Sequence, residues 1–355
     1  MNEILDTITS LSHEFGGGDY VKAGGGNTSC KSGDRLWIKP SGTTLLGLTP
    51  EKFVQMHRDT LGALYATPPP SGVNERESWV QEMMAASVDP STPGRASVEA
   101  PLHDSFDAAF VVHTHPALVN GLTCALGGEA AARKLFPEAL WVPYTDPGYT
   151  LCMQVRKALV ERRAAGGEPS VTLLGNHGVF VAGDSADEIR ATYSRLFDTL
   201  KAAYAASGVS TDLAFSGPAP SASAVSRVHA AAREALGEAA AFIAASAPLV
   251  PAAGPFSPDH IVYAKSFPFE GAVTADAFRY FAEARGYAPR LVSTPEGFYA
   301  LGATRKAADL ALVLGLDGAL VRQLSAAFGG PRTLDDRSRL FIENWEVESY
   351  RAKQA

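Results

Sequence analysis

Residues 109–116 read AFVVHTHP, and residues 171–183 read VTLLGNHGVFVAG. Both segments contain strongly apolar runs of strand length, and each carries histidine at the end of such a run. Because alternate residues of a strand share a face, we expect His113 and His115 to project together, with Thr114 pointing the other way. His177 precedes Gly178 at a turn between two apolar runs, where a side chain can face a cleft. Each histidine alone would be read as a hydrogen-bonded core residue, but three neutral imidazoles with an open fourth position are typical of a catalytic zinc site.

Helical and strand patterns alternate on both sides of these segments, which predicts an α/β fold. Pro116 is expected to open a helix that runs through Leu126. Two further helices are expected near residues 151–163 and 186–205, separated from each other by the apolar run at 171–183. Upstream, apolar residues between Ile4 and Leu11 have helical spacing, and a short strand is expected around Leu36-Trp37-Ile38.

The chain is expected to form two domains. Residues 208–224 lose hydrophobic periodicity and gather Gly, Pro and Ser, so we predict a linker between a domain at 1–207 and a smaller α/β domain at 225–355. GVFVAGDSADE, from Gly178, can be laid over GFYALGATRKAAD, from Gly297. Either an ancestral duplication or chance similarity between two strand-turn-helix units accounts for this likeness.

Composition excludes several classes of function. A net charge of −7 and a pI near 5.7 argue against nucleic-acid binding, since phosphate recognition normally shows as a basic excess. An acidic chain of this kind is more consistent with a small-molecule partner than with a nucleic acid. The three cysteines form no CxxC pair, which argues against a disulfide framework and a thiolate metal cage. The N-terminus lacks a signal pattern and no apolar run reaches the roughly 20 residues of a membrane span, so we expect a cytoplasmic protein without a membrane partner.

Glu99 lies in the segment SVEAPLH, near the start of a predicted helix. By itself it would be read as a solvated glutamate of a first helical turn, where the helix dipole favours an anion. Chemistry at a histidine-bound metal also needs a carboxylate to move a proton on the carbon next to the polarised carbonyl. Glu99 is the best-placed candidate for that acid/base.

Two glycine-containing loops, AGGGNTS and KPSGTT, offer consecutive backbone N–H groups beside hydroxyls and amides. Such nests can bind phosphate oxygens without net positive charge, although a plain tight turn is the usual reading of a glycine loop. Neither loop fits the Walker A pattern or the dinucleotide pattern GxGxxG.

Taken in order, GGGNTSCKSGDRLWIKPSG, SVEAPLH, VVHTHP, WVPYTDPGYTL and LLGNHGVFVAG resemble the class II aldolase/adducin family over about residues 14 to 205. With GPFSPDHIVYAKSFP and FIENWEVESYR, the likeness extends to the aldolase part of bifunctional rhamnulose-1-phosphate aldolase/alcohol dehydrogenases. The resemblance implies an α/β/α sandwich with a mostly antiparallel central sheet, a bound Zn²⁺, and commonly a homotetramer with active sites at subunit interfaces.

Carried over residue by residue, the resemblance makes His113, His115 and His177 the zinc ligands and Glu99 the catalytic acid/base. It also allows Glu99 to be a fourth ligand before substrate binds. The family's phosphate or substrate contacts fall on Gly26, Asn27, Ser41, Gly42 and Ser97.

The chain departs from the family pattern at three places. Val98 stands where these aldolases often have a second serine before the glutamate, which removes a hydroxyl from the expected phosphate pocket. The tyrosine that family aldolases receive from a neighbouring subunit has no clear match, although Tyr144 and Tyr149 lie in the right region. The bifunctional relatives continue into a nicotinamide-binding dehydrogenase beyond the point of Ala355, so we expect no NAD site.

The leading functional hypothesis is an aldolase that acts on a ketose 1-phosphate of the rhamnulose- or fuculose-phosphate kind and releases dihydroxyacetone phosphate and an aldehyde. A pentulose-phosphate 4-epimerase, a dehydratase or a decarboxylase would use the same metal site, but the epimerases typically carry Asp in place of Glu99. A non-catalytic adducin-like module would be expected to lose ligands, and a regulatory sugar-binding protein would keep them. Histidine nitrogen also suits Mn²⁺ and Co²⁺.

Overall fold

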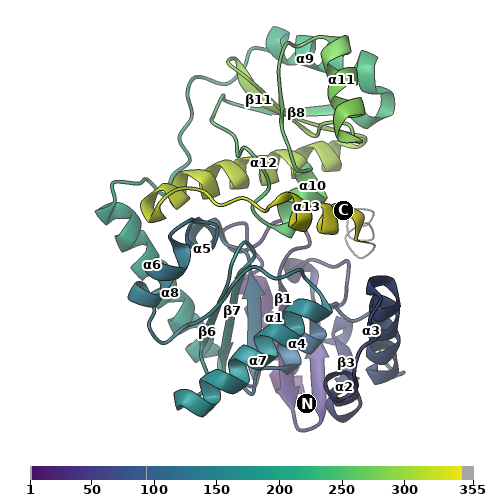
Figure 1. Cartoon of the computed structure of the whole chain (residues 1–355), viewed down its shortest axis with the longest axis vertical. Coiled ribbons are helices and arrows are strands. Elements are labelled where there is room, and N and C mark those ends of the chain that lie inside the picture. The colour runs from purple at the N-terminus through teal and green to yellow at the C-terminus, as the bar shows by residue number, and fades with distance from the viewer. Residues whose placement is uncertain (1, 93, 346–355) are drawn as a thin grey trace. The chain divides into compact units, whose positions relative to one another are not determined.

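The computed structural model describes residues 2–92 and 94–345. The chain folds into two compact units (Figure 1). The first unit is made of residues 1–119 and 129–200, and the second of residues 120–128 and 201–355. The irregular stretch expected at 208–224 lies between helix α8, which ends at Ala206, and helix α9, which begins at Ala222. The domain boundaries expected from the sequence stay a prediction.

The first unit is built on a seven-stranded sheet in the order β3-β2-β1-β4-β7-β6-β5. Five of the six neighbouring pairs are antiparallel, and only β5 and β6 run parallel. The mostly antiparallel central sheet is therefore confirmed, as a mixed sheet with one parallel edge. The strands are β1 (Asn27–Ser32), β2 (Arg35–Ile38), β3 (Val54–His57), β4 (Phe110–Thr114), β5 (Leu140–Val142), β6 (Val171–Leu174) and β7 (Gly178–Gly183).

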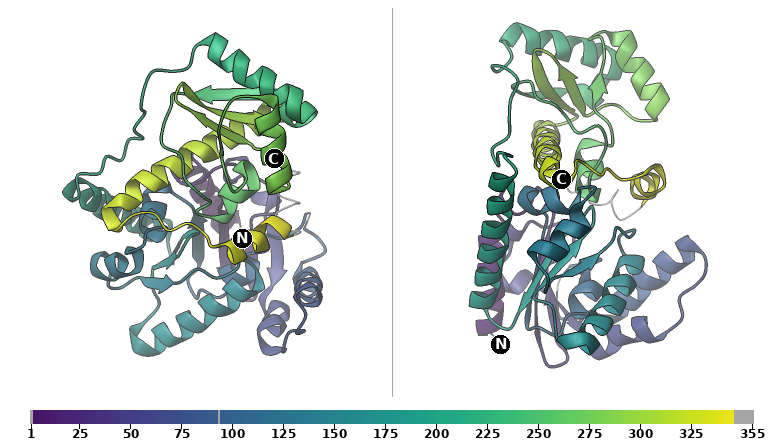
Figure 2. Two further views of the ribbon diagram at one scale, coloured as in Figure 1. Left: turned by 45° about the horizontal axis from the view of Figure 1, so that its top comes forward. Right: turned by 60° about the vertical axis from the view of Figure 1, so that its left-hand side comes forward.

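Helices cover both faces of this sheet, with α1 and α8 on one side and α4 and α7 on the other (Figure 2). Side-chain contacts follow the alternation along the strands. The Thr114 hydroxyl meets the Tyr193 hydroxyl of α8 at 2.7 Å, whereas Val111 packs into the apolar cluster of α7. The α/β/α sandwich is confirmed. Its helices are α1 (Asn2–Glu14), α2 (Arg58–Ala66), α3 (Val73–Ser87), α4 (Ala100–Asp104), α5 (Ala117–Thr123), α6 (Gly128–Leu135), α7 (Tyr149–Gly166) and α8 (Ala186–Ala206).

The second unit has a four-stranded sheet in the order β8-β11-β10-β9, which confirms the smaller C-terminal α/β part. The aromatic side chains of Phe278, Phe269 and Tyr299 pack between this sheet and the helices α9 and α11. Its elements are β8 (Phe242–Ser246), β9 (Phe269–Glu270), β10 (Leu291–Thr294), β11 (Gly297–Gly302), α9 (Ala222–Leu236), α10 (Pro258–Ala264), α11 (Ala275–Arg285), α12 (Arg305–Ser325) and α13 (Asp336–Asn344).

The likeness between residues 178–188 and 297–309 is part of a larger repeat of topology. The order β8-β11-β10-β9 matches β4-β7-β6-β5, and in both sets the last pair is parallel and the others are antiparallel. The register also agrees, because Phe110 lies opposite Gly183 as Phe242 lies opposite Gly302. In this repeat, Ala245 occupies the place of His113, so the second unit lacks that candidate metal ligand.

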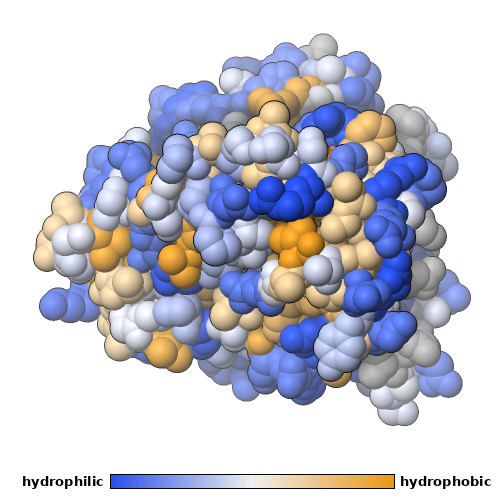
Figure 3. All heavy atoms as spheres, turned by 90° about the horizontal axis from the view of Figure 1, so that it is seen from above, coloured by the Kyte–Doolittle hydropathy of each residue, from blue (hydrophilic) through white to orange (hydrophobic). Residues whose placement is uncertain are grey.

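Among the described residues, one helical segment, Arg305–Phe328, is long and apolar enough to cross a membrane by length and composition. Half of its most apolar window is buried, and the helix packs against β8, β11 and α10. This is the pattern of a core helix, so it is weak evidence for a membrane span. On the face shown in Figure 3, hydrophobic residues form separate small groups among hydrophilic ones.

Candidate metal centre

The three histidines expected to bind a metal lie together in the first unit. His113 is in β4, His115 directly follows that strand, and His177 lies in the turn between β6 and β7. One ring nitrogen from each lies within 4.8 Å of the other two, and all three side chains are buried. Nε2 of His115 is 3.0 Å from Nε2 of His113. The structure therefore brings the predicted ligands to one point.

The backbone fixes which nitrogen of His113 faces this point. Nδ1 of His113 lies 3.0 Å from the carbonyl oxygen of Val179. Because a carbonyl oxygen only accepts hydrogen bonds, Nδ1 must carry the proton, and Nε2 keeps its lone pair. A neighbour that holds one ring nitrogen in this way is the usual support of a metal-binding histidine.

Glu99 is the N-cap residue of α4, but its side chain does not cap that helix. Instead, Oε1 lies 3.6 Å from Nε2 of His113 and 3.6 Å from Nε2 of His177. The other oxygen, Oε2, accepts a hydrogen bond from the side-chain amide of Asn27. The carboxylate thus has one oxygen among the histidines and one fixed by Asn27.

Two glycines let the backbone come close at this site. A Cβ at Gly178 would lie 2.4 Å from the carbonyl oxygen of Thr114 and 2.6 Å from the ring of His115. A Cβ at Gly26, where φ is +73°, would lie 2.8 Å from the carbonyl oxygen of His113. Asn176 adopts a φ of +53°, which turns the chain sharply just before His177. The backbone can approach His113 and His115 this closely because Gly26 and Gly178 have no side chain.

The five residues expected to contact phosphate occupy three neighbouring segments. Gly26 and Asn27 begin β1, where Asn27 pairs with His113. Ser41 and Gly42 lie in a turn whose Ser41 N–H donates to the carbonyl of Arg95 at 2.8 Å. The Ser97 hydroxyl accepts from the backbone N–H of Glu99 at 3.2 Å, so it touches the acid/base candidate directly. Their contact with phosphate stays a prediction.

Two polar residues of β1 lie close to this site: Ser29, which the sequence interpretation counted as part of a phosphate-binding nest, and Lys31, which it missed. Ser29 and Lys31 follow Asn27 at alternate positions, and both are buried. Ser29 Oγ lies 2.8 Å from Nδ1 of His103, and the Lys31 amine donates to the carbonyl oxygen of His103 at 2.8 Å. Burial lowers the pKa of Lys31 to about 7 and lowers the pKa of His103 well below its ordinary value, which keeps that ring neutral. The sequence signal for this polar face was the alternation of Asn27, Ser29 and Lys31 in the segment NTSCKS.

The donor set fits a divalent transition metal ion. Zinc–nitrogen bonds of about 2.0 to 2.1 Å at tetrahedral angles place ligand nitrogens about 3.3 Å apart. Nε2 of His115 lies 3.0 Å from Nε2 of His113, and one ring nitrogen of each histidine lies within 4.8 Å of the other two, which is compatible with that spacing. Imidazole nitrogen is a ligand for several other divalent ions besides zinc, so the donor set leaves the metal open.

Known proteins resemble about half of this chain. The uncharacterized oxidoreductase YuxG of Bacillus subtilis (strain 168) is 26% identical over 174 residues, a match that covers 46% of this chain and 24% of that relative. This chain thus spans about a quarter of the relative's length. The N-terminal class II aldolase domain of a conserved protein from Thermoplasma acidophilum is 24% identical and covers 56% of this chain and 92% of its own, with a TM-score of 0.48. The l-fuculose-1-phosphate aldolase of Thermus thermophilus is 19% identical and covers 57% and 94%, with a TM-score of 0.36.

The family model for the class II aldolase and adducin N-terminal domain matches residues 6–204, which is more than half of the chain. The matched stretch contains all three histidines and Glu99. The chain belongs to the class II aldolase and adducin family.

Proposed function

We propose that the protein is a zinc-dependent aldolase that reversibly cleaves a ketose 1-phosphate, of the rhamnulose- or fuculose-phosphate kind, to dihydroxyacetone phosphate and an aldehyde. One observation carries the proposal: a Glu99 carboxylate oxygen lies 3.6 Å from the Nε2 atoms of both His113 and His177. A base beside a three-histidine cluster is the arrangement that proton transfer next to a polarised carbonyl requires.

His113, His115 and His177 would hold the ion. When bound, such an ion acts as a Lewis acid that polarises a carbonyl oxygen and stabilises negative charge on it. During cleavage the hydroxyl on the leaving carbon gives up its proton and becomes the aldehyde carbonyl, the carbon–carbon bond breaks, and its electron pair remains on the carbon next to the ketone. One proton is lost from that hydroxyl and one is gained by this carbon, so the reaction needs no net proton. Glu99 delivers the proton to that carbon, and in the synthetic direction it removes the same proton. The Asn27 amide holds Oε2 of Glu99, so Oε1 is the oxygen that moves the proton.

Two other functions use the same residues. A pentulose-phosphate 4-epimerase or a dehydratase would need the same ion and a carboxylate, but the family's epimerases typically have Asp at the position of Glu99. An adducin-like binding module needs neither ligands nor base. The buried histidine cluster with Glu99 beside it favours catalysis over that module.

The test combines metal content with turnover. Protein purified without added metal is assayed by mass spectrometry for bound metal and screened for cleavage of ketose 1-phosphates and the free sugars. Glu99→Gln should keep the metal and lose dihydroxyacetone phosphate release by at least about 100-fold, as expected for removal of a general acid/base. Glu161→Gln is the matched control, because Glu161 is an exposed residue of α7 that forms a surface pair with Lys157.

Each result decides between functions. Bound zinc with cleavage that depends on Glu99 supports the aldolase. Bound zinc without cleavage of any ketose phosphate favours the epimerase or dehydratase, and metal-free folded protein rejects the three-histidine site. We also propose that the protein is cytoplasmic, as its few cysteines and its N-terminal sequence indicate, and that it forms a homotetramer, as the family resemblance implies. Light scattering should then give about four times the 37.4 kDa mass of one chain.

A further inference from the structure

Glu99 is carried by a helix that is too short to be stable by itself. Helix α4 spans the five residues Ala100–Asp104, with Glu99 as its N-cap. Isolated helices shorter than about 12 residues are marginal in water, because the first turn fixes many dihedral angles for one hydrogen bond. The direction in which Glu99 points must therefore be imposed by neighbouring elements.

Strand β1 supplies three of the contacts that hold this segment. Its side chains at alternate positions all face α4, as the strand repeat requires. Asn27 reaches the carboxylate of Glu99, Ser29 reaches the ring of His103, and the amine of Lys31 reaches the carbonyl oxygen of His103. One polar face of one strand thus contacts the beginning and the end of α4.

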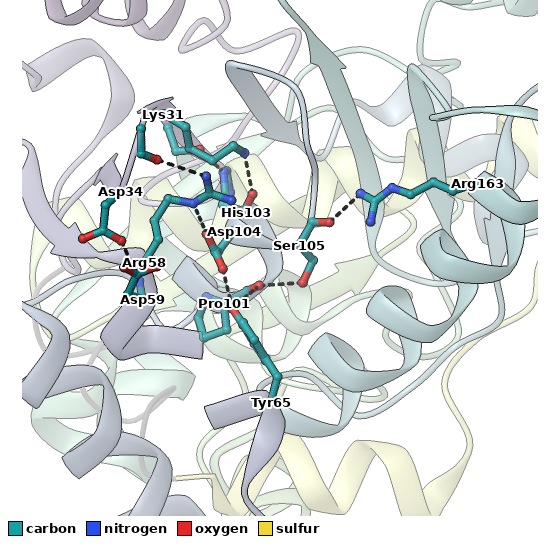
Figure 4. Close-up of polar contacts among 12 residues, drawn as sticks. Lys31, Asp34, Arg58, Asp59, Tyr65, Pro101, His103, Asp104, Ser105 and Arg163 are labelled. Carbon is teal, nitrogen blue, oxygen red and sulfur yellow. Dashed lines mark hydrogen bonds and ion pairs between the residues drawn. The ribbon is translucent and has the colours of Figure 1, made fainter. Parts of the chain in front are cut away.

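Side chains of α2 and α7 also contact α4 and the residue that follows it (Figure 4). The carboxylate of Asp104 accepts from Arg58 Nε at 2.6 Å and from the Tyr65 hydroxyl at 3.0 Å. Tyr65 also donates to the carbonyl oxygen of Pro101 at 3.2 Å. Arg163 donates to the carbonyl oxygen of Ser105 at 2.8 Å. Side chains from β1, α2 and α7 therefore fix the last turn of α4.

Lys31 is the unusual member of this set. Only 6% of its surface is exposed, and burying an amine costs free energy that an apolar side chain of the same length would avoid. Its hydrogen bond goes to a backbone carbonyl in the last turn of α4, one of the carbonyl groups that have no partner within a helix. The amine therefore has a defined partner, and that partner belongs to the segment that carries Glu99.

We propose that Lys31 is a positioning residue, which holds the C-terminal end of α4 so that Glu99 at its N-terminal end faces the three histidines. The proposal rests on the proposed function of Glu99 as acid/base. The contacts described for Lys31 go to His103 and not to His113, His115, His177 or Glu99. Its effect reaches Glu99 through the backbone of α4, in which the His103 N–H bonds to the Glu99 carbonyl at 3.0 Å.

The experiment compares Lys31→Met and Lys31→Arg with Lys157→Met. The first variant removes the amine at nearly constant length, the second keeps a cationic donor, and the third removes a mostly exposed lysine of α7 as a control. We measure bound metal, kcat and KM on the substrate found for the wild type, and hydrogen exchange at the amides of His103 and Ser105.

Lys31→Met should keep its metal and its KM while kcat falls ten- to 100-fold, because a displacement of about 1 Å at a reacting group can cost about 100-fold. Exchange at His103 and Ser105 should become faster in the same variant, since the last turn of α4 loses a fixed contact. Lys31→Arg should recover part of both effects. Lys157→Met should match the wild type in every measurement.

Two results would overturn the proposal. If kcat and amide exchange in Lys31→Met equal those of the wild type, Lys31 does not position α4. If bound metal falls instead, Lys31 acts on the histidines and not on Glu99. When the wild type turns over no ketose phosphate, the proposed function fails, yet amide exchange still decides whether Lys31 holds α4. Should Lys31→Met not fold, Tyr65→Phe removes another contact to the same turn and must give the same loss of kcat with metal retained.

Discussion

Phe180 lies flat against the imidazole of His113, with ring centroids 4.0 Å apart and an angle of 10° between the planes. Phe180 also stacks on Phe106, with centroids 5.3 Å apart and 28° between the planes, and forms a T-shaped contact with His103 at 5.3 Å and 72°. The plane of the His113 ring is therefore set by buried aromatic packing, in addition to the hydrogen bond from Nδ1 to Val179. A ligand held in place before the ion arrives loses little conformational freedom on binding.

Replacing Phe180 by Leu should weaken metal binding about tenfold, because the ring of His113 gains freedom to rotate. Mutation of a residue that orients a metal ligand typically lowers metal affinity about 10- to 100-fold. The measurement is competition with a chelator of known affinity. Phe106→Leu is the matched control, since Phe106 is equally buried but stacks on Phe180 and not on His113. Both variants should lose about 1 to 2 kcal/mol of unfolding free energy. Equal metal affinity in the two variants would contradict the role of the stack.

Gly178→Ala should abolish metal binding. The added methyl group would lie 2.4 Å from the backbone carbonyl oxygen of Thr114, which cannot move without shifting β4, and 2.6 Å from the ring of His115. Metal content by mass spectrometry measures the loss. Gly62→Ala in α2 is the control, because nothing lies within 4 Å of its added Cβ, and a helical Gly→Ala change usually stabilises by up to about 1 kcal/mol. A Gly178→Ala protein with full metal occupancy would show that the strands shift freely.

Lys31 should also make the stability of the protein depend on pH. Burial lowers the pKa of Lys31 from its ordinary 10.5 to about 7. Between these two values the unfolded chain holds the proton on this amine and the folded chain does not. The contribution of Lys31 to the unfolding free energy therefore rises with pH from about 7 to about 10.5, by at most about 1.4 kcal/mol per pH unit, and its destabilising effect is complete below pH 7. The titratable groups around this amine are Asp104, Arg58, Asp107 and Cys30, and the Cys30 thiol stays neutral at these pH values because burial raises its pKa to about 12.

The measurement is denaturant unfolding of the wild type and Lys31→Met at pH 7 and at pH 9.5. The wild type should gain stability relative to the variant as the pH rises, since only the wild type carries the titrating amine. Taking the difference between the two proteins removes groups that titrate in both. A difference that is the same at both pH values would mean that Lys31 titrates at its ordinary pKa.

The sequence predicted the three clustered histidines better than the contacts that hold Glu99 beside them. His113, His115 and His177 could be found because strand alternation and a glycine turn are local patterns. The contact of Lys31 with α4 could not be predicted from the sequence. It depends on the pairing of β1 with β4 and on how α4 packs across these two strands. The helix expected from Pro116 through Leu126 was too long for a similar reason. It ends at Thr123, since residues 124–127 bond to a segment about 200 positions later.

The bonds between residues 124–127 and the later segment make the expected domain boundary at residue 207 testable. Residues 120–128 belong to the second unit, where the Leu126 N–H donates to the carbonyl of Gly330 at 2.9 Å. The Gly127 N–H donates to Phe328 at 2.8 Å, and the Arg332 N–H donates to Cys124 at 2.7 Å. A fragment that ends at residue 207 contains residues 124–127 but lacks residues 328–332, to which they are hydrogen-bonded.

A fragment of residues 1–207 should therefore melt at least about 10 °C below the intact chain, or aggregate, because several backbone groups and the apolar side chains around them lose their partners. The control is the full chain with a protease site inserted at exposed Ala219 and then cut. Cutting there leaves every partner of residues 120–128 present, so the nicked protein should melt within a few degrees of the uncut one. Thermal unfolding and size-exclusion chromatography measure both. If the fragment instead melts like the intact chain, residues 1–207 are an independent domain, and the contacts of residues 120–128 add little to its stability.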